Sequence, residues 1–321
     1  MSISIIIPVY NEEESLPLLH QALHHTLDTL DQPWEVILVD DGSRDKSAEI
    51  LETLALADPE HVRAVILRRN FGQTTAIAAG IDHATGEVII LMDADLQNDP
   101  VDIPRMLAKL DEGYDVVSGW RFDRQDEFVT RTLPSRMANS LISWVTGVHL
   151  HDYGCTLKAY RREVITGFRL YGEMHRFIPA YAGSVGAKIV ELPVTHHARR
   201  FGKTKYGLER TAKVVLDLFT VKFLLSFAQK PIYLFGGAGL ALMAISAIGM
   251  LLLMLRRILF GTFVLTSPFF IIAVMLVMMG FQSILMGLIA ELLVRTYHES
   301  QAKPTYTVKK AWANGTRSDG R

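Results

Sequence analysis

Two aspartates separated by one residue, Asp93 and Asp95, carry the clearest chemical signal in this chain. They follow an unbroken apolar run at residues 88–92, which is typical of a strand buried on both faces. Acids at the carboxyl end of such a strand face the crevice in which α/β sheets bind ligands. Residues i and i+2 of an extended segment point to one side, so both carboxylates can hold a hard divalent cation through oxygen. The alternative is a solvated turn with two acids, and the neighbouring motifs argue against it.

Two long stretches without a charged side chain lie in the C-terminal third of the chain, from Pro231 to Leu255 and from Ile258 to Ala290. Both exceed the roughly 20 residues that an α-helix needs to cross a bilayer. The first is rich in Gly and Ala, which let helices pack closely in lipid. We therefore expect a two-helix transmembrane hairpin over residues 231–291, with the buried hairpin of a soluble protein as the alternative.

Basic residues near the ends of these spans predict their orientation. Arg256 and Arg257 lie in the short connection between the spans. A larger basic set lies on the side shared by both termini: Lys213, Lys222, Lys230, Arg295, Lys303, Lys309 and Lys310. This bias predicts an inner (cytoplasmic) membrane protein whose N-terminal domain and two termini face the cytoplasm. The single Cys155 fits a reducing compartment, and the net charge of -1 gives no reason to expect a nucleic-acid partner.

The first 120 residues alternate short apolar runs with amphipathic stretches. Strands are predicted over residues 3–9, 35–39, 62–67, 88–92 and 116–118. Helices are predicted between them, for example over residues 15–30 and 46–56. This alternation predicts an α/β fold with a mostly parallel, Rossmann-like sheet and helices on both faces.

The expected domains follow from these patterns. The α/β domain would cover residues 1–207, and the hairpin residues 231–291. Residues 208–230 between them are apolar with interspersed Lys, which predicts amphipathic helices in the membrane interface. Residues 292–321 would form a cytoplasmic tail.

Polar residues follow each of the first four predicted strands, at residues 8–13, 40–43, 69–73 and 93–97. Turn chemistry accounts for Asp-Gly-Ser and Asn-Phe-Gly, but not for acids at successive strand ends along one edge. A pocket at this edge would suit a ring nitrogen, a ribose and a metal-bound diphosphate.

These segments resemble the family 2 glycosyltransferases with a GT-A fold. The motifs that carry the resemblance are PVYNE at 8–12, DDGS at 40–43, NFGQ at 70–73, DADLQ at 93–97, DYGCTLK at 152–158 and RFGKTKY at 200–206. With the two C-terminal spans, the chain is most similar to the polyprenyl-phosphate glycosyltransferases. These include dolichol-phosphate mannosyltransferase, the bactoprenol glucosyltransferases and the undecaprenyl-phosphate formamido-arabinose transferase. The resemblance extends from Ser2 to about Tyr306.

The resemblance implies inverting transfer of a single sugar from a UDP- or GDP-sugar to undecaprenyl or another polyprenyl phosphate at the cytoplasmic face of the membrane. It implies a Mg²⁺ or Mn²⁺ ion held by Asp93, Asp95 and Gln97. The residues expected to bind the nucleotide sugar are Pro8, Tyr10, Glu12, Asp41, Asp93, Gln97 and Arg121. Relatives often assemble through their hairpins, which implies a homo-oligomer.

An anionic acceptor that approaches an anionic donor also needs positive charge, and Arg and Lys bind phosphate in different ways. We expect Arg131, Arg136 and Lys203 to bind the acceptor phosphate, with the solvated face of a helix as the alternative for the two arginines. Arg200 and Lys205 match the R-x-G-x-[ST]-K loop of the family, which implies catalytic roles on a loop that closes over the substrates.

Asp152 is the candidate catalytic base of the family. A phosphate monoester has a second pKa of about 6, so the acceptor is mostly a dianion at neutral pH and needs little proton abstraction. We therefore expect Asp152 to orient the acceptor or to brace a cationic neighbour, with a helix N-cap or turn acid as the structural alternative. His196, His197 and the histidines from His20 to His25 are expected to be packing or surface residues.

Three other functions are compatible with parts of this pattern. A processive polysaccharide synthase would carry a Q-x-x-R-W motif and more spans, and neither is present. A sugar nucleotidyltransferase would place a Gly-rich, Arg-bearing loop after the first strand, where this chain has Tyr-Asn-Glu. A catalytically inactive membrane scaffold could retain the fold, but the intact acids at positions 41, 93, 95 and 152 weigh against it.

Overall fold

The protein is described from a computed structural model of residues 1–321. The residues that this structure describes are 1–122, 133–166, 170, 174–198, 230–261, 263–265, 267–300, 311–313 and 316–318. The chain divides into two compact units, Met1–Val221 together with Arg321, and Lys222–Gly320.

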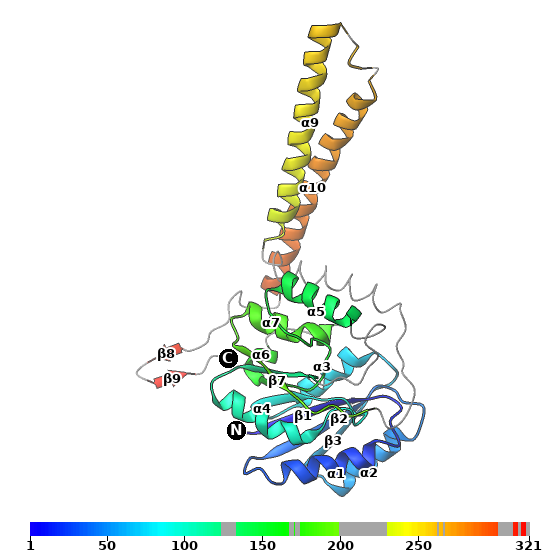
Figure 1. Ribbon diagram of the computed structural model, residues 1–321, viewed down its shortest axis with the longest axis vertical. Coiled ribbons are helices and arrows are strands. Elements are labelled where there is room, and N and C mark those ends of the chain that lie inside the picture. Colours follow the sequence, from blue (N-terminus) through cyan, green and yellow to red (C-terminus); the bar gives the residue numbers. More distant parts are fainter. Residues whose placement is uncertain are drawn as a thin grey trace. The chain divides into compact units, whose positions relative to one another are not determined.

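The first unit contains a sheet of seven strands (Figure 1). The strands are β1 (Ile3–Val9), β2 (Trp34–Asp40), β3 (Val62–Ile66), β4 (Val88–Leu91), β5 (Val116–Trp120), β6 (Lys158–Arg161) and β7 (Ile189–Pro193). Their order is β3-β2-β1-β4-β6-β5-β7. The pairs β1·β2, β1·β4, β2·β3 and β5·β7 are parallel, and β6 is antiparallel to both β4 and β5. The predicted, mostly parallel α/β sheet is confirmed, whereas β6 is a strand that the sequence patterns did not predict.

Helices cover both faces of this sheet (Figure 1). The helices on one face are α1 (Leu16–Leu27), α2 (Ser47–Ala57) and α4 (Ile103–Asp111). Those on the other face are α3 (Gln73–His83), α6 (Arg162–Ile165) and α7 (Ile178–Ser184). Successive strand residues alternate between the two cores: Ile5 and Ile7 of β1 belong to the first, and Ile6 to the second. Burial on both faces explains why β1, β2 and β4 are mostly apolar.

Three further described elements belong to this unit: η1 (Pro100–Asp102), α5 (Leu133–Thr146) and η3 (Met174–Phe177). The side chains of α5 are described from Asn139 onward.

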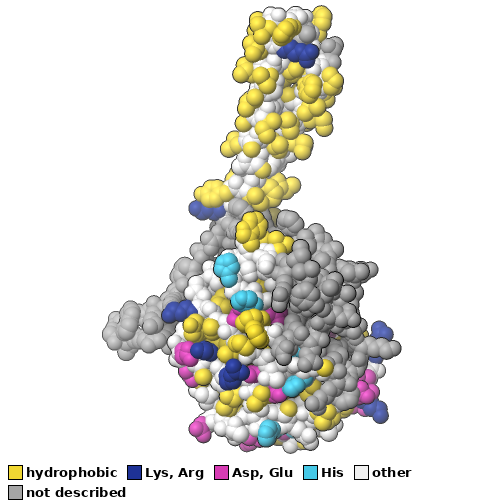
Figure 2. All heavy atoms as spheres, viewed as in Figure 1, with side chains coloured by type: hydrophobic (Ala, Val, Ile, Leu, Met, Phe, Trp, Pro, Cys, Tyr) yellow, Lys and Arg dark blue, Asp and Glu magenta, His cyan; other side chains and the backbone are white. Residues whose placement is uncertain are grey.

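The second unit contains two long helices, α9 (Ile232–Phe260) and α10 (Pro268–Ser300), and two short strands, β8 (Ala311–Ala313) and β9 (Thr316–Ser318). Both helices are long and apolar enough to cross a membrane. Figure 2 shows hydrophobic side chains spread along the visible surface of this hairpin. The helices approach closely at Gly239 and Gly280, because a Cβ added to Gly239 would lie 2.5 Å from the carbonyl oxygen of Gly280.

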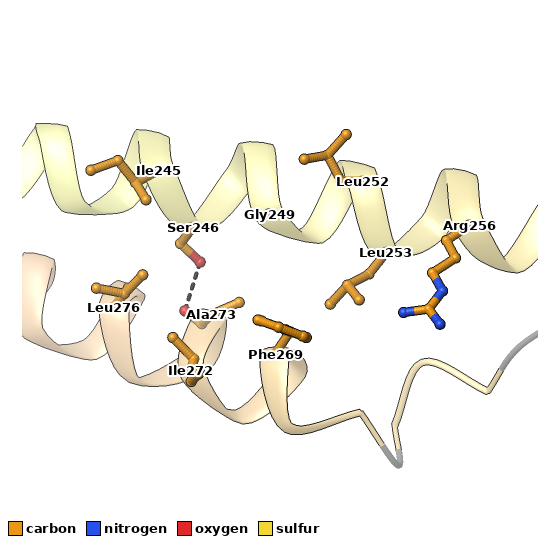
Figure 3. A pocket seen from close by; sticks show the side chains of 10 residues that line it. All are labelled: Ile245, Ser246, Gly249, Leu252, Leu253, Arg256, Phe269, Ile272, Ala273 and Leu276. Atoms are coloured by element: carbon orange, nitrogen blue, oxygen red, sulfur yellow. Dashed lines mark hydrogen bonds between the residues drawn. The ribbon is translucent and has the colours of Figure 1, made fainter.

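A cavity of about 310 Å³ lies between α9 and α10 (Figure 3). Its walls include Leu253, Phe269 and other apolar side chains, and Arg256 lies at one end. Ser246 Oγ, which also lines the cavity, donates a hydrogen bond to the carbonyl oxygen of Ala273 at 2.6 Å. These apolar walls do not suit a nucleotide or a hard metal ion, whose ligands are oxygen-rich.

Candidate functional site

The carboxyl ends of β2, β1 and β4 lie side by side at one edge of the sheet, because the three strands are parallel neighbours. In this register Val9 pairs with Asp40, and Pro8, within β1, pairs with Val39. The segments that leave this edge are residues 10–13, 41–43 and 93–97. The structure therefore brings together three of the polar segments that the sequence singled out.

Hydrogen bonds between side chains and backbone lock the first two of these segments together. The backbone N–H of Asn11 donates to Ser43 Oγ at 2.9 Å, and Asn11 Oδ1 accepts the N–H of Arg44 at 2.8 Å. Asn11 adopts a positive φ of 55°, a conformation that Asn tolerates better than most residues. These contacts fix the backbone on which the half-buried Tyr10 and Glu12 stand.

Asp41 is buried after β2 and holds the loop that precedes α3. Its carboxylate accepts the N–H of Phe71 at 2.7 Å and the N–H of Gly72 at 2.9 Å. Burial raises the pKa of Asp41, the two N–H donors oppose this rise, and the charge of Asp40 adds to it. The loop packs so closely that a Cβ on Gly42, whose φ is +68°, would lie 2.4 Å from a facing backbone carbon. Asp41 therefore shapes this edge of the site.

Asp93 lies where the first turn of α3 meets the segment before β6. Gln73 Nε2 donates to Asp93 Oδ1 at 2.8 Å, and Thr156 Oγ1 donates to Oδ2 at 2.6 Å. Burial raises the pKa of Asp93 to about 6 and the charge of Asp95 adds to the rise, while the Thr156 hydrogen bond and two nearby basic groups oppose it. Because Gln73 follows directly on the loop that Asp41 holds, the two acids are connected through residues 71–73.

The turn after β4 presents the remaining oxygen ligands. Asp95 Oδ1 accepts the backbone N–H of Gln97 at 3.2 Å, and Leu96 between them has a positive φ of 59°. Asp93, Asp95 and Gln97 are all half-buried. Two carboxylates and an amide oxygen on one partly exposed turn form the kind of ligand set that Mg²⁺ or Mn²⁺ takes in proteins. The residues present therefore fit the expected cation.

A buried ion pair joins the end of β5 to the loop before β6. Arg121 Nε donates to Asp152 Oδ2 at 2.7 Å, and Nη2 donates to Oδ1 at 2.9 Å. Asp152 is 3% exposed and also accepts the N–H of Gly154 at 3.1 Å. Burial alone would lower the pKa of the Arg121 guanidinium, but the hydrogen bonds and charge of Asp152 raise it. The Asp152 carboxylate thus binds a permanent cation.

Lys158, the first residue of β6, is a buried cation of this site to which the sequence reasoning gave no role. It is 3% exposed, and its Nζ donates to the carbonyl oxygen of Tyr153 at 3.1 Å and to that of Cys155. Burial lowers the pKa of Lys158 and the charges of Arg121 and Arg176 add to the change, while the charge of Asp152 opposes it. Lysines are rarely buried, so the residue type itself gave no indication of a buried position. The only signal in the sequence was that Lys158 ends the motif at 152–158.

The turn after β4 is also bound to the segment that follows β7. The N–H of His197 donates to the carbonyl oxygen of Gln97 at 2.8 Å, and His197 Nε2 lies 2.9 Å from Asp99 Oδ2. Asn98 and His196 form an isolated antiparallel bridge beside this contact. The expectation of a packing or surface role was therefore too limited for His197, which connects two loops at the site.

Several predicted residues lie outside the described part of the chain: Arg131, Arg200, Lys203 and Lys205. Arg136 belongs to α5, but its side chain is also outside the description. Their roles stay predictions.

Comparison with known proteins gives a consistent result. The family model "Glycosyl transferase family 2" matches residues 4–168. Dodecaprenyl-phosphate galacturonate synthase of Rhizobium johnstonii is 42% identical over 313 residues, which cover 97% of this chain and 93% of that protein. Undecaprenyl-phosphate 4-deoxy-4-formamido-L-arabinose transferase of Klebsiella pneumoniae is 42% identical over 308 residues, which cover 96% of this chain and 93% of the relative.

Among solved structures, glucosyl-3-phosphoglycerate synthase of Mycobacterium tuberculosis, in complex with Mn²⁺, UDP and phosphoglyceric acid, aligns with a TM-score of 0.53 and 18% sequence identity. The alignment covers 70% of this chain and 78% of that one. At this identity the likeness concerns the fold, which is the GT-A fold.

Proposed function

Because the chain belongs to glycosyl transferase family 2, we propose that it transfers one sugar from a nucleotide-sugar donor to a polyprenyl phosphate at the membrane. The names of both similar relatives combine a polyprenyl phosphate with a sugar, and the similarity covers nearly the full length of each chain. The observation that carries the proposal is the Asp93 carboxylate at the carboxyl edge of the sheet, held by Gln73 and Thr156.

The donor would bind along this carboxyl edge. Asp93, Asp95 and Gln97 would hold Mg²⁺ or Mn²⁺, which compensates negative charge on a leaving nucleoside diphosphate when it is bound. Residues 8–12 would contact the base and the ribose, as the family resemblance implies. Asp41 would contribute at least indirectly, because its carboxylate holds the loop that ends at the site.

Asp152 would act as a positioning residue for Arg121 and not as a proton acceptor. The acceptor phosphate has a second pKa of about 6 and is mostly ionised at neutral pH, so its oxygen can attack without a base. Two hydrogen bonds from the Arg121 guanidinium and one from the N–H of Gly154 support this role, because they engage both oxygens of the carboxylate. Held in this way, the guanidinium would be oriented to bind phosphate oxygens of the substrates.

The two apolar helices would anchor the protein in the bilayer that holds the lipid acceptor. The prenyl chain would lie in the bilayer with α9 and α10, and the N-terminal unit and both termini would face the cytoplasm. From the resemblance, Arg131, Arg136 and Lys203 would bind the acceptor phosphate, and Arg200 and Lys205 would assist the transfer. Direct attack of a phosphate oxygen on the anomeric carbon would invert its configuration. The hairpins would also be the surfaces through which a homo-oligomer assembles.

The test uses purified full-length protein in detergent, undecaprenyl phosphate and a panel of UDP- and GDP-sugars that includes the galacturonate and formamido-arabinose donors. We expect one donor to yield a prenyl-linked sugar together with an equal amount of nucleoside diphosphate, as measured by mass spectrometry and a coupled assay. NMR of the glycolipid gives the anomeric configuration, and retention would contradict direct attack.

Two double variants, one at the proposed metal ligands and one at exposed acids elsewhere, test this assay. The double variant Asp93→Asn/Asp95→Asn should lose at least ~10²-fold in rate. The matched control, Glu52→Gln/Asp111→Asn, removes two exposed acids from α2 and α4 and should retain the wild-type rate. If no donor in the panel yields a prenyl-linked sugar, or if the Asp93/Asp95 variant matches the control, the proposal is wrong.

A further inference from the structure

A cluster of three side chains of types that bind metals lies at the opposite end of the parallel strands from Asp93. It consists of His20 and His24 on α1 and Asp58 at the C-cap of α2, and is called the histidine cluster below. One ligand atom from each residue lies within 4.8 Å of the other two. Because Asp58 lies in the short segment between α2 and the start of β3 at Val62, the cluster belongs to the amino ends of the parallel strands, whereas Asp93 lies at the carboxyl end of β4.

The local fold creates this cluster from residues that the sequence patterns treated as surface histidines. His20 and His24 are four residues apart, so a helix places them on one face. Asp58 is 34 residues from His24 in the chain and reaches it only because α1 and α2 lie on the same face of the sheet. The spacing along the sequence therefore could not reveal the third ligand.

The distances suit a small cation bound by all three residues. His24 Nε2 lies 2.9 Å from Asp58 Oδ2, and His20 Nε2 lies 3.6 Å from the same oxygen. With bonds typical of Zn²⁺, two ligand atoms of a tetrahedral site are about 3.4 Å apart, which lies between these two values. His20 Nε2 is buried and has no hydrogen-bond partner among the described residues. A metal bond would satisfy this nitrogen, which is otherwise costly to bury.

Outer contacts orient the ligands, as they do around known metal sites. His24 Nδ1 lies 3.0 Å from Asp28 Oδ2, a contact that favours the tautomer whose Nε2 lone pair faces the cluster. His61 Nδ1 lies 2.9 Å from Asp58 Oδ1, which leaves Oδ2 directed at the two ligand histidines. The His61 ring is itself stacked on Trp34, with ring centroids 4.1 Å apart.

We propose that His20, His24 and Asp58 bind a borderline divalent cation such as Zn²⁺. Imidazole ligands favour Zn²⁺ over Mg²⁺ and Mn²⁺, so the cluster differs in preference from the oxygen ligands at Asp93 and Asp95. Three protein ligands leave a fourth position for water. The ion links α1 to the end of α2, and its role is to stabilise the N-terminal unit, independently of sugar transfer.

The experiment uses full-length protein without a histidine tag, in detergent, after removal of metal with EDTA. Calorimetric titration with ZnCl₂ and the visible spectrum of the Co²⁺ form measure binding, and the melting temperature is recorded with and without Zn²⁺. We expect one Zn²⁺ per chain, a tetrahedral Co²⁺ spectrum, a higher melting temperature with Zn²⁺ and no competition by excess Mg²⁺.

Four variants locate the site. His20→Ala/His24→Ala should weaken Zn²⁺ binding far more than tenfold, and Asp28→Asn, which removes an outer contact, should weaken it by about tenfold or more. His25→Ala, an exposed histidine on the same helix, is the matched control and should bind as the wild type does. Asp93→Asn/Asp95→Asn should also bind Zn²⁺ normally.

Wild-type affinity in the His20/His24 variant would overturn the proposal, as would loss of binding confined to the Asp93/Asp95 variant. Circular dichroism and gel filtration in the presence of EDTA verify that each variant is folded. Because these readouts do not use glycosyl transfer, the proposal can fail while the proposed function stands, and the reverse also holds.

Discussion

Replacing Asp152 with Asn removes one charge from the buried Arg121–Asp152 pair and changes the side-chain volume little. The pair is joined by hydrogen bonds of 2.7 and 2.9 Å, and the exposed fractions of the two side chains are 16% for Arg121 and 4% for Asp152. Removing one partner of a buried ion pair costs about 3–5 kcal/mol of unfolding free energy. The amide still offers one oxygen to the guanidinium, so we expect the lower end of this range and a fall in Tm of roughly 6–12 °C.

The effect on catalysis separates positioning from proton abstraction. If Asp152 only holds Arg121, we expect kcat to fall about tenfold, whereas loss of a general base costs about 10²–10⁴. Positioning also predicts strong non-additivity with Arg121→Gln, because both substitutions break the same pair. The double variant should then be little slower than Arg121→Gln alone. Initial rates of nucleoside diphosphate release, at saturating donor and acceptor, measure all three variants.

Glu35 provides a matched control for the stability effect. It is a buried carboxylate, 6% exposed, that lies 3.0 Å from Arg63 at the amino end of β2, away from the site. Glu35→Gln should lower Tm as Asp152→Asn does but leave kcat unchanged. Asp152 does not act by positioning Arg121 if Asp152→Asn lowers kcat more than about a hundredfold with little change in Tm, or if its effect on kcat simply adds to that of Arg121→Gln.

Asp93→Asn is expected to lower kcat by at least ~10²-fold and to weaken the response to added Mg²⁺ or Mn²⁺, and an unchanged metal titration would contradict its role as a ligand. His197→Ala is expected to raise the KM for the donor more than it lowers kcat, because it removes the contact with Asp99 beside the turn after β4; an unchanged KM would argue against this link. Burial lowers the pKa of His175 to about 3, from the usual 6.5, so the folded protein binds fewer protons than the unfolded chain between these values, and stability falls as the pH drops below 6.5. On acidification below pH 6.5, the His175→Asn variant should therefore lose less unfolding free energy than the wild type, by up to ~1.4 kcal/mol per pH unit. Parallel curves of Tm against pH for the two proteins would refute the assignment of this acid sensitivity to His175.

The parallel half of the sheet could be predicted because local sequence and tertiary burial agree there. β1, β2 and β4 are buried on both faces, and such strands read as unbroken apolar runs. β6 has four residues, begins with a buried Lys and ends with Arg. Its strand conformation depends on pairing with β4 and β5, which lie far from it in the chain, and no local pattern contains that information.

At the site, too, the sequence predicts what depends on local strand direction but not what depends on contacts between distant residues. The position of Asp93 follows from strand direction, since a residue that ends a parallel strand must lie at the carboxyl edge. Its hydrogen-bond partners do not follow, because Gln73 is 20 residues away and Thr156 is 63 residues away. Asp152 meets Arg121 across 31 residues, so the sequence could suggest a cationic neighbour for Asp152 without identifying it.

The connections among these acids also limit what single substitutions can reveal. The Asp41 carboxylate holds the N–H groups of Phe71 and Gly72, and the next residue, Gln73, donates to Asp93. A substitution at Asp41 can therefore disturb Asp93 without removing any contact to a nucleotide. Loss of activity alone would not distinguish a binding role from a structural one at this position. The distinction requires donor affinity to be measured separately from kcat, because a displaced Asp93 affects the chemical step as well as binding.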